Sequence, residues 1–152
     1  MTDAATLAAL HATAFDGPAR WSQAAFTHAL TSPACFFFPR GGDPNGFALG
    51  RVAADDAELL TLVVARAHRG HGIGRVLLDG FEAEAARRGA RRVFLEVAAD
   101  NVSALGLYDR AGWDVIGQRP GYYGGVDAVT MSKDLAAPPA TADAASGAVP
   151  AP

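Results

Sequence analysis

The stretch HRGHGIGR (68–75) decides the fold of this 152-residue chain. It places three glycines, two arginines and two histidines between an apolar run and a long stretch with helical periodicity. Glycine leaves backbone N–H groups accessible, and such groups at a helix N-terminus form a site for anions. Because Arg69 and Arg75 add positive charge, the stretch predicts a phosphate or pyrophosphate site between a strand and a helix.

A plain connection, a dinucleotide-binding loop and a Walker loop each fit this stretch less well. A tight connection between a strand and a helix needs only one or two glycines. A dinucleotide-binding loop that starts at Gly70 would need glycine or alanine where the chain has Arg75, and five residues (65–69) separate the strand from the first glycine. A Walker loop fails because no Gly-Lys-Ser or Gly-Lys-Thr run is present. The pattern that remains is Arg69-x-x-Gly72-x-Gly74 at the start of a helix.

The composition indicates one globular domain followed by a tail. Hydrophobic residues make up 50% of the chain, enough for a core without crosslinks. Cys35 is the only cysteine, so no internal disulfide can form, and we expect a small buried side chain there. The final stretch has no aromatic residue and one charge. We therefore predict a domain over 1–135 and a disordered Ala/Pro-rich tail over 136–152.

Charge and hydropathy exclude several classes of partner. The net charge is −3 and the isoelectric point is near 5.7, which argues against a nucleic-acid-binding protein. No apolar run reaches the roughly 18 residues of a membrane span, and the N-terminus lacks the basic flank of a signal peptide. The four scattered histidines form no metal-binding pattern. We expect a cytoplasmic protein without a nucleic-acid, membrane or metal partner.

Hydrophobic periodicity predicts two helices, three strands, a helix, a strand, a helix and two strands. The predicted helices cover 4–14, 23–30, 72–88 and 102–110, and the predicted strands cover 35–38, 46–54, 57–65, 91–98, 113–118 and 128–135. Asp55 and Asp56 are expected to form the turn between the second and third strands. Along 91–98, alternate residues should face opposite sides of the sheet, with Phe94 and Glu96 on the same side. This order predicts an α/β protein with a mixed sheet.

The sequence around the loop resembles the GNAT N-acetyltransferases. In that family, R-x-x-G-x-G after a strand is the signature for the pyrophosphate of acetyl-CoA, and the resemblance extends over LTLVVARAHRGHGIGRVLLDGFEAEAARRGARRVFLEVAADNVSALGLYDRAGW (60–113). FLEV (94–97) and RPGYY (119–123) are similar to the RimI branch, whose members acetylate the N-terminal alanine of a small-subunit ribosomal protein. The resemblance implies the GNAT (acyl-CoA N-acyltransferase) fold, a mixed and mostly antiparallel sheet with helices on both faces. The family's usual first strand, before the first helix, is expected to be absent or very short.

The resemblance also implies direct transfer of acetyl to an amine, without a covalent enzyme intermediate. Glu96 is the implied general base, and it is an unusual residue inside the apolar run of 93–97. Glu58 is the reserve candidate for the base. Tyr108 is the implied general acid, because a tyrosine is protonated at neutral pH and can donate to a leaving thiolate.

The binding residues follow from the same resemblance. A bulge or splay of the third strand should present its backbone to the pantetheine arm, at Leu62, Val63 and Val64. The residues expected around the pyrophosphate are Arg69, Gly70, His71, Gly72, Ile73, Gly74 and Arg75. Asn101 is either a further cofactor contact, a plain helix cap, or both. Tyr122 and Tyr123, expected in a Pro/Gly loop, and Glu58 are the candidate substrate contacts.

Three functions remain open from the sequence. The leading hypothesis is an acetyltransferase acting on a protein N-terminus, with the N-terminal alanine of a ribosomal protein as the expected substrate. The second is acetylation of a small amine or a lysine side chain within the same family. The third is a catalytically silent acyl-CoA-binding module. The tyrosine run favours the first hypothesis over the second, and the presence of both Glu96 and Tyr108 argues against the third.

Overall fold

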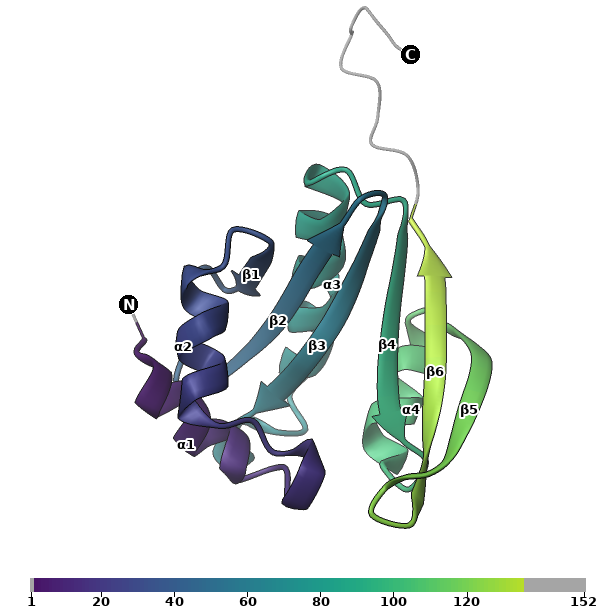
Figure 1. Ribbon diagram of the computed structural model, residues 1–152, viewed down its shortest axis with the longest axis horizontal. Helices are drawn as coiled ribbons and strands as arrows, with labels where there is room; N and C mark the ends of the chain where they lie inside the picture. Colours follow the sequence, from purple (N-terminus) through teal and green to yellow (C-terminus); the bar gives the residue numbers. More distant parts are fainter. Residues whose placement is uncertain (1, 136–152) are drawn as a thin grey trace, which may run out of the picture.

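The computed structural model describes residues 2–135, and its elements follow the predicted order (Figure 1). The helices are α1 (Ala4–Ala12), α2 (Gln23–Thr31), α3 (Ile73–Arg87) and α4 (Val102–Arg110), with short 3-10 turns at Gly17–Ala19 and Arg66–His68. The strands are β1 (Cys35–Phe38), β2 (Gly46–Ala53), β3 (Asp56–Val64), β4 (Arg92–Ala98), β5 (Asp114–Tyr123) and β6 (Val126–Asp134). The tail predicted over 136–152 lies outside the described residues. No helix in the described part is long and apolar enough to cross a membrane.

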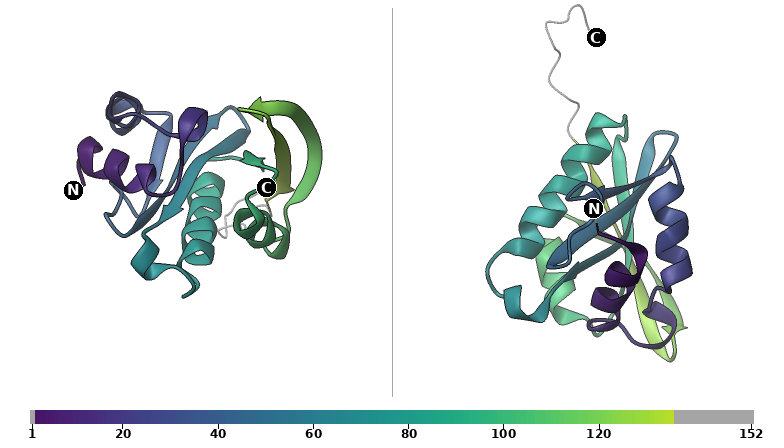
Figure 2. Two further views of the ribbon diagram at one scale, coloured as in Figure 1. Left: turned by 90° about the horizontal axis from the view of Figure 1, so that it is seen from below. Right: turned by 90° about the vertical axis from the view of Figure 1, so that its left-hand side faces the viewer.

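The six strands form one mixed sheet in the order β1-β2-β3-β4-β6-β5. Only β3 and β4 pair in parallel, and α3 makes the crossover between them. Helices α1 and α2 cover one face of the sheet, and α3 and α4 cover the other (Figure 2). The predicted architecture, a mixed and mostly antiparallel sheet with helices on both faces (Figure 2), is confirmed. Within the described residues α1 is the first element, so no strand precedes it.

Each face of the sheet has its own hydrophobic core. On one face the buried stripe of α3, which includes Leu77, Phe81 and Ala85, packs against Val93 and neighbouring strand residues. On the other face, residues of α1 and α2 pack against Phe47 and its neighbours. Burying one such large side chain contributes about 1.5–3 kcal/mol. The periodicity that predicted α3 thus also identifies the face that it buries.

Strands β3 and β4 pair over only part of their length. Their register runs from Asp56 opposite Arg92 to Leu59 opposite Leu95 and then stops. Beyond that point β3 contains a bulge, because Leu49 and Gly50 of β2 pair with Thr61 and Leu59, which leaves Leu60 over. Figure 1 shows the two strands diverging toward their C-terminal ends. The sheet is therefore open between 60–64 and 96–98.

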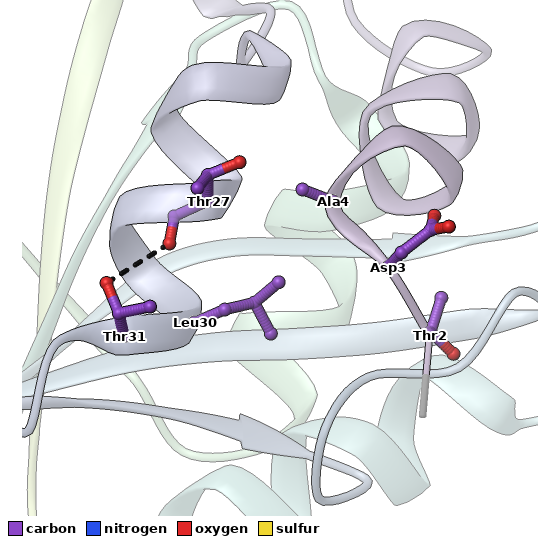
Figure 3. A pocket seen from close by; sticks show the side chains of 6 residues that line it. All are labelled: Thr2, Asp3, Ala4, Thr27, Leu30 and Thr31. Atoms are coloured by element: carbon purple, nitrogen blue, oxygen red, sulfur yellow. Dashed lines mark hydrogen bonds between the residues drawn. The ribbon is translucent and has the colours of Figure 1, made fainter.

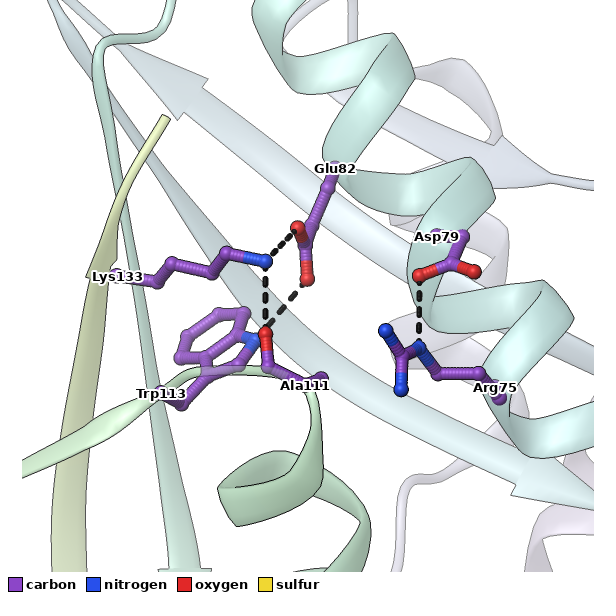
Figure 4. Close-up of polar contacts among 6 residues, drawn as sticks. All are labelled: Arg75, Asp79, Glu82, Ala111, Trp113 and Lys133. Atoms are coloured by element: carbon purple, nitrogen blue, oxygen red, sulfur yellow. Dashed lines mark hydrogen bonds and ion pairs between the residues drawn. The ribbon is translucent and has the colours of Figure 1, made fainter. Parts of the chain in front are cut away.

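A buried polar cluster fixes the C-terminal end of α4 (Figure 4). The Glu82 carboxylate of α3 accepts hydrogen bonds from Lys133 Nζ at 2.7 Å and from Trp113 Nε1 at 3.0 Å. Lys133 Nζ also donates to the Ala111 carbonyl at 2.8 Å. Because both partners of this ion pair are largely buried and further hydrogen-bonded, the cluster holds α3, β6 and the end of α4 in one arrangement.

His11 joins α1 to β3 from inside the core. Its ring is fully buried, and Nδ1 accepts a hydrogen bond from the Trp21 backbone N–H at 3.2 Å. Nε2 lies 2.8 Å from Thr61 Oγ1. With Nδ1 accepting, Nε2 carries the proton and donates to Thr61, so the ring is neutral. Burial, with a smaller contribution from Arg20, lowers the pKa of His11 to about 4.

The His11 ring should make stability depend on pH. Between pH 6.5 and 4 the unfolded chain binds a proton at this residue and the folded chain does not, so stability is expected to fall as the pH falls through that window. The full loss is on the order of 3 kcal/mol. Urea unfolding from pH 4.5 to 7.5 would measure it. His11→Asn should flatten this part of the profile and the exposed His28→Asn should not, so an equal slope in both variants would contradict the assignment.

The structure corrects four details of the sequence prediction. The predicted first helix, 4–14, ends at Ala12. The hairpin turn was placed at Asp55 and Asp56, but Asp56 already pairs with Ala53, so the turn is Ala54–Asp55. Cys35 was expected to be buried and is only half-buried, because it begins the edge strand β1. The strand predicted over 113–118 extends to Tyr123.

Candidate active site

The glycine loop forms an open, uncapped N-terminus for α3. Gly72 is the N-cap residue with φ at 79°, Gly70 has φ at 80°, and both angles favour glycine. A Cβ atom at either glycine would meet no atom within 4 Å. No side chain in residues 2–135 caps the first N–H groups of α3. These groups and the space in front of them suit an anion such as a pyrophosphate.

The basic residues of the loop already have protein partners. Arg69 Nε donates to the carbonyl of Val64 at 2.9 Å, which ties the loop to the end of β3. Arg75 pairs with Asp79 one turn along α3 at 3.0 Å, a surface pair that contributes little stability. His71 Nδ1 lies 3.4 Å from the carbonyl of His68. Both arginines keep their terminal nitrogens for an anion, but the Asp79 carboxylate partly neutralises Arg75, so Arg69 is the better placed of the two.

The C-terminal part of β3 does not pair with β4, and it contains Leu62, Val63 and Val64. Their partners Ala48, Phe47 and Gly46 are all on β2, so the opposite edge of β3 has no strand partner among the described residues. The bulge at Leu60 lies at the start of this free edge. The predicted bulge or splay is present, and it leaves backbone groups of β3 available to an extended ligand.

Glu96 lies on β4 beside the opening and has a donor at each carboxylate oxygen. Arg119 of β5 donates through Nη2 to Oε1 at 2.7 Å, and Thr130 of β6 donates through Oγ1 to Oε2 at 3.4 Å. The Glu96 side chain is 24% exposed. As predicted, it lies on the opposite side of β4 from the buried Val93, Leu95 and Val97. The two hydrogen bonds therefore fix the Glu96 carboxylate on the face of the sheet that α1 and α2 cover.

The candidate substrate residues gather around this carboxylate. Tyr122 and Tyr123 were predicted in a loop, but they end β5, because the Gly124–Gly125 turn comes directly after them. Burial raises the pKa of the Tyr123 hydroxyl, and the nearby carboxylates of Glu96 and Glu58 raise it further. Glu58 itself pairs with Arg51 at 2.9 Å. The two tyrosines thus lie side by side, close enough to Glu96 for its charge to act on Tyr123, whereas Glu58 is bound to Arg51 on β2.

Tyr108 lies on the other side of the sheet. It belongs to the core shared with α3 and Val97, and its ring packs against Trp113 with centroids 5.9 Å apart. The residue is 7% exposed, and burial raises the pKa of its hydroxyl above the ordinary value of 10. Its hydroxyl has no hydrogen-bond partner within the described residues. Glu96 and Tyr108 thus lie on opposite faces of the sheet.

Asn101 acts as a helix cap. Its Oδ1 accepts a hydrogen bond from the Ala104 backbone N–H at 3.2 Å. This geometry satisfies one of the unpaired donors at the start of α4. The side-chain NH₂ group is not used in the cap, so a further contact with a ligand stays a prediction.

A separate pocket between α1 and α2 is not part of this site (Figure 3). Its lining residues are Thr2, Asp3, Ala4, Thr27, Leu30 and Thr31. The Thr31 hydroxyl donates to the Thr27 carbonyl, the Thr27 hydroxyl donates to the Gln23 carbonyl, and Asp3 caps α1. Because these polar groups are already bonded within the helices, the pocket offers little chemistry to a ligand.

Arg119 and Thr130 were missed by the sequence prediction. Arg119 begins the RPGYY run, so its neighbourhood was identified but its contact with Glu96 was not. Thr130 of β6 lies opposite Glu96 of β4. This register depends on the position of the turn between β5 and β6. No three His, Cys, Asp or Glu side chains within residues 2–135 are close enough together to hold a metal ion.

The fold and the site together define a protein of the acyl-transferase type, with an anion-binding loop and an opened parallel strand pair. The family model "Acetyltransferase (GNAT) family" matches residues 6–113, and this chain belongs to that family. The N-alpha-acetyltransferase RimI of Mycobacterium tuberculosis is 40% identical over 144 residues, covering 90% of this chain and 89% of the relative. The [ribosomal protein bS18]-alanine N-acetyltransferase of Escherichia coli is 33% identical over 101 residues, covering 64% and 68%.

Solved structures show the same similarity. The crystal structure of the ribosomal-protein-S18-alanine N-acetyltransferase from Escherichia coli matches with a TM-score of 0.75 and 26% identity. The match covers 89% of each chain. The family expected from the glycine loop is confirmed, and the relatives are N-acetyltransferases.

Proposed function

We propose that this chain transfers the acetyl group of acetyl-CoA to the α-amino group at the N-terminus of a protein. The candidate substrate is the N-terminal alanine of a ribosomal protein, as in the names of the Escherichia coli relatives. A ribosomal substrate would place the enzyme in the cytoplasm. The observation that carries the proposal is the held carboxylate of Glu96 beside the opening between β3 and β4.

The α3 side of the opening suits acetyl-CoA. The uncapped N–H groups around Gly72, with the terminal nitrogens of Arg69, would bind the pyrophosphate. The free edge of β3 at 62–64 would bind the pantetheine arm through backbone hydrogen bonds. Acetyl-CoA supplies a thioester whose carbonyl carbon is open to attack by an amine.

Two residues would handle the protons. The amine must lose a proton as its nitrogen bonds to the carbonyl carbon, and Glu96 would accept that proton directly or through water. As the carbon–sulfur bond breaks, Tyr108 would donate a proton to the sulfur. Burial keeps the Tyr108 hydroxyl protonated at neutral pH, because the phenolate is disfavoured there. Glu96 and Tyr108 would therefore act from opposite faces of the sheet. The amine would meet the thioester between them, in the opening between β3 and β4.

An N-terminal amine fits this base better than a lysine side chain does. The α-amino group has a pKa of about 7.7–8.0, against about 10.4 for lysine, so a carboxylate needs less driving force to deprotonate it. The tyrosine pair beside Glu96 offers flat surfaces for a peptide that enters with its N-terminus first.

The proposal is tested with purified protein, acetyl-CoA and four acceptors. These are a peptide that begins with alanine, the same peptide with a blocked N-terminus, a peptide with an internal lysine and a blocked N-terminus, and spermidine. Mass spectrometry reads each product. Acetylation of the free N-terminal peptide alone is the expected result. Acetylation of lysine or spermidine alone would mean that the acceptor is that amine and not a protein N-terminus. Binding of acetyl-CoA without any product would favour the binding-module hypothesis.

Tyr108→Phe separates a role in proton transfer from a role in packing. The variant keeps the ring in the core and removes a buried hydroxyl that has no partner in residues 2–135, so the melting temperature should stay the same or rise slightly. We expect kcat to fall about 10²-fold or more, the contribution of a positioned acid. Steady-state kinetics and thermal unfolding measure the two effects. An unchanged kcat would remove Tyr108 from the mechanism.

A further inference from the structure

Arg119 connects the candidate base to the candidate substrate surface. Its Nη2 donates to Glu96 Oε1 at 2.7 Å, and its guanidinium lies 3.7 Å from the centre of the Tyr122 ring. The arginine side chain is 52% exposed, so the ion pair by itself would add little to stability. Stacking on an aromatic ring restricts a guanidinium and adds a cation–π attraction. The carboxylate, the guanidinium and the ring therefore form a chain of three groups joined by two contacts, which begins at Glu96.

The groups that face Glu96 come from three strands. From β5 these are Arg119, Tyr122 and Tyr123, and from β6 the neutral hydroxyl of Thr130. From β3, Glu58 is close enough to Tyr123 to influence it, but Arg51 already pairs with Glu58. Arg119 is thus the cation that contacts Glu96. The hydrogen bond to Glu96 is also the main reason that the pKa of Arg119 is raised above its ordinary value.

We propose that Arg119 is a positioning residue for the reaction: it fixes the Glu96 carboxylate beside the opening, and Tyr122 fixes Arg119. This inference rests on the proposed function. The guanidinium orients one carboxylate oxygen through a charge-assisted hydrogen bond. Its positive charge also disfavours a second cation nearby, so an incoming ammonium would lose its proton more readily. Both effects act on proton transfer and leave acetyl-CoA binding, on the other face, untouched.

The test compares Arg119→Gln and Arg119→Lys with a matched control at the C-terminal end of α3. Arg88, the C-cap residue, makes the same two kinds of contact, an ion pair with Glu84 at 2.7 Å and a stack on Phe36 at 4.8 Å, but it lies outside the candidate site. Steady-state kcat and KM with the alanine peptide are measured for each variant. Acetyl-CoA affinity and melting temperature are measured for each variant.

For Arg119→Gln we expect kcat to fall about 10- to 100-fold, part of the 10²- to 10⁴-fold contribution of a positioned base. KM for the alanine peptide should change much less than kcat, because the carboxylate loses its orientation while the peptide can still bind. Arg119→Lys should recover part of kcat but not the full rate, since lysine keeps the charge and loses the flat stack. Arg88→Gln should keep the wild-type kcat and KM.

Three outcomes would overturn the inference. They are a wild-type kcat in Arg119→Gln, the same fall in kcat in Arg88→Gln, or a weaker affinity for acetyl-CoA as the main effect of Arg119→Gln. If Arg119→Gln does not fold, Arg119→Lys decides, and full wild-type kcat in that variant would count against the stacked arrangement. A wild-type protein that does not acetylate the alanine peptide would contradict the proposed function instead, and the variants would then be compared on whichever amine it acetylates.

Discussion

Replacement of Glu96 with glutamine is expected to lower kcat about 10²- to 10⁴-fold, the contribution of a positioned general base. Glutamine keeps the size and can still bond to Arg119, but it cannot accept a proton from the amine. Acetyl-CoA affinity should stay near the wild-type value, because the Glu96 side chain lies on the face of β4 opposite to the one that packs against α3. Steady-state kinetics with the alanine peptide and calorimetric titration of acetyl-CoA measure the two effects.

Substitutions of two further glutamates test whether the fall in kcat is specific to Glu96. Glu84→Gln on α3 removes a carboxylate that is paired with Arg87 and Arg88, and it should leave kcat unchanged. Glu58→Gln tests the reserve base on the same face as Glu96. A large fall in kcat for Glu58→Gln with normal turnover in Glu96→Gln would transfer the role to Glu58. A similar small effect in both would mean that neither carboxylate is the base.

Gly72→Val is expected to weaken the binding of acetyl-CoA sharply. A β-branched residue at φ 79° is strained, and its side chain would fill the space in front of the first N–H groups of α3. Two charge-assisted hydrogen bonds lost at about 1.5 kcal/mol each correspond to a Kd weakened by about 100-fold. Calorimetric titration gives the Kd, and kcat/KM for acetyl-CoA should fall in parallel.

The other end of α3 supplies the control for this prediction. Gly89 follows the helix with φ at 97°, and a Cβ there would also meet no atom within 4 Å. Gly89→Val should therefore cost a similar amount of stability, about 1–2 kcal/mol of backbone strain, and leave acetyl-CoA binding intact. If both variants lose affinity equally, the effect of Gly72→Val comes from strain in the helix and the loop is not the binding site.

Much of the fold could be predicted because local signals agreed. The α3 stripe, the caps at Ser22 and Asn101, and the alternation along β4 each follow from residues close in sequence. The bounds of β5 could not be predicted in this way. Proline and several glycines among residues 117–125 indicate a loop, yet pairing with β6 keeps the segment extended to Tyr123. Tertiary pairing overrode the local preference there.

The candidate site was predicted in part for the same reason. The residues of the glycine loop are contiguous in the sequence, so their pattern alone predicts the conformation of the loop. The contact between Glu96 and Arg119 spans 23 residues and depends on the order β4-β6-β5, which no local pattern encodes. The position of Tyr108 on the opposite face from Glu96 likewise follows from α4 packing beside α3, with the Glu82–Lys133 pair holding the end of that helix.

The opening between β3 and β4 also affects how the acceptor specificity of this protein can evolve. In the function that we propose, the residues on the donor side come mainly from one stretch, 62–75, whereas those on the acceptor side come from β4 and the β5–β6 hairpin. Substitutions in 119–130 would then alter which amine is accepted without disturbing the loop at α3. A duplicated copy of the chain could acquire a new acceptor through changes in that hairpin alone, while its requirement for the acetyl donor is inherited unchanged.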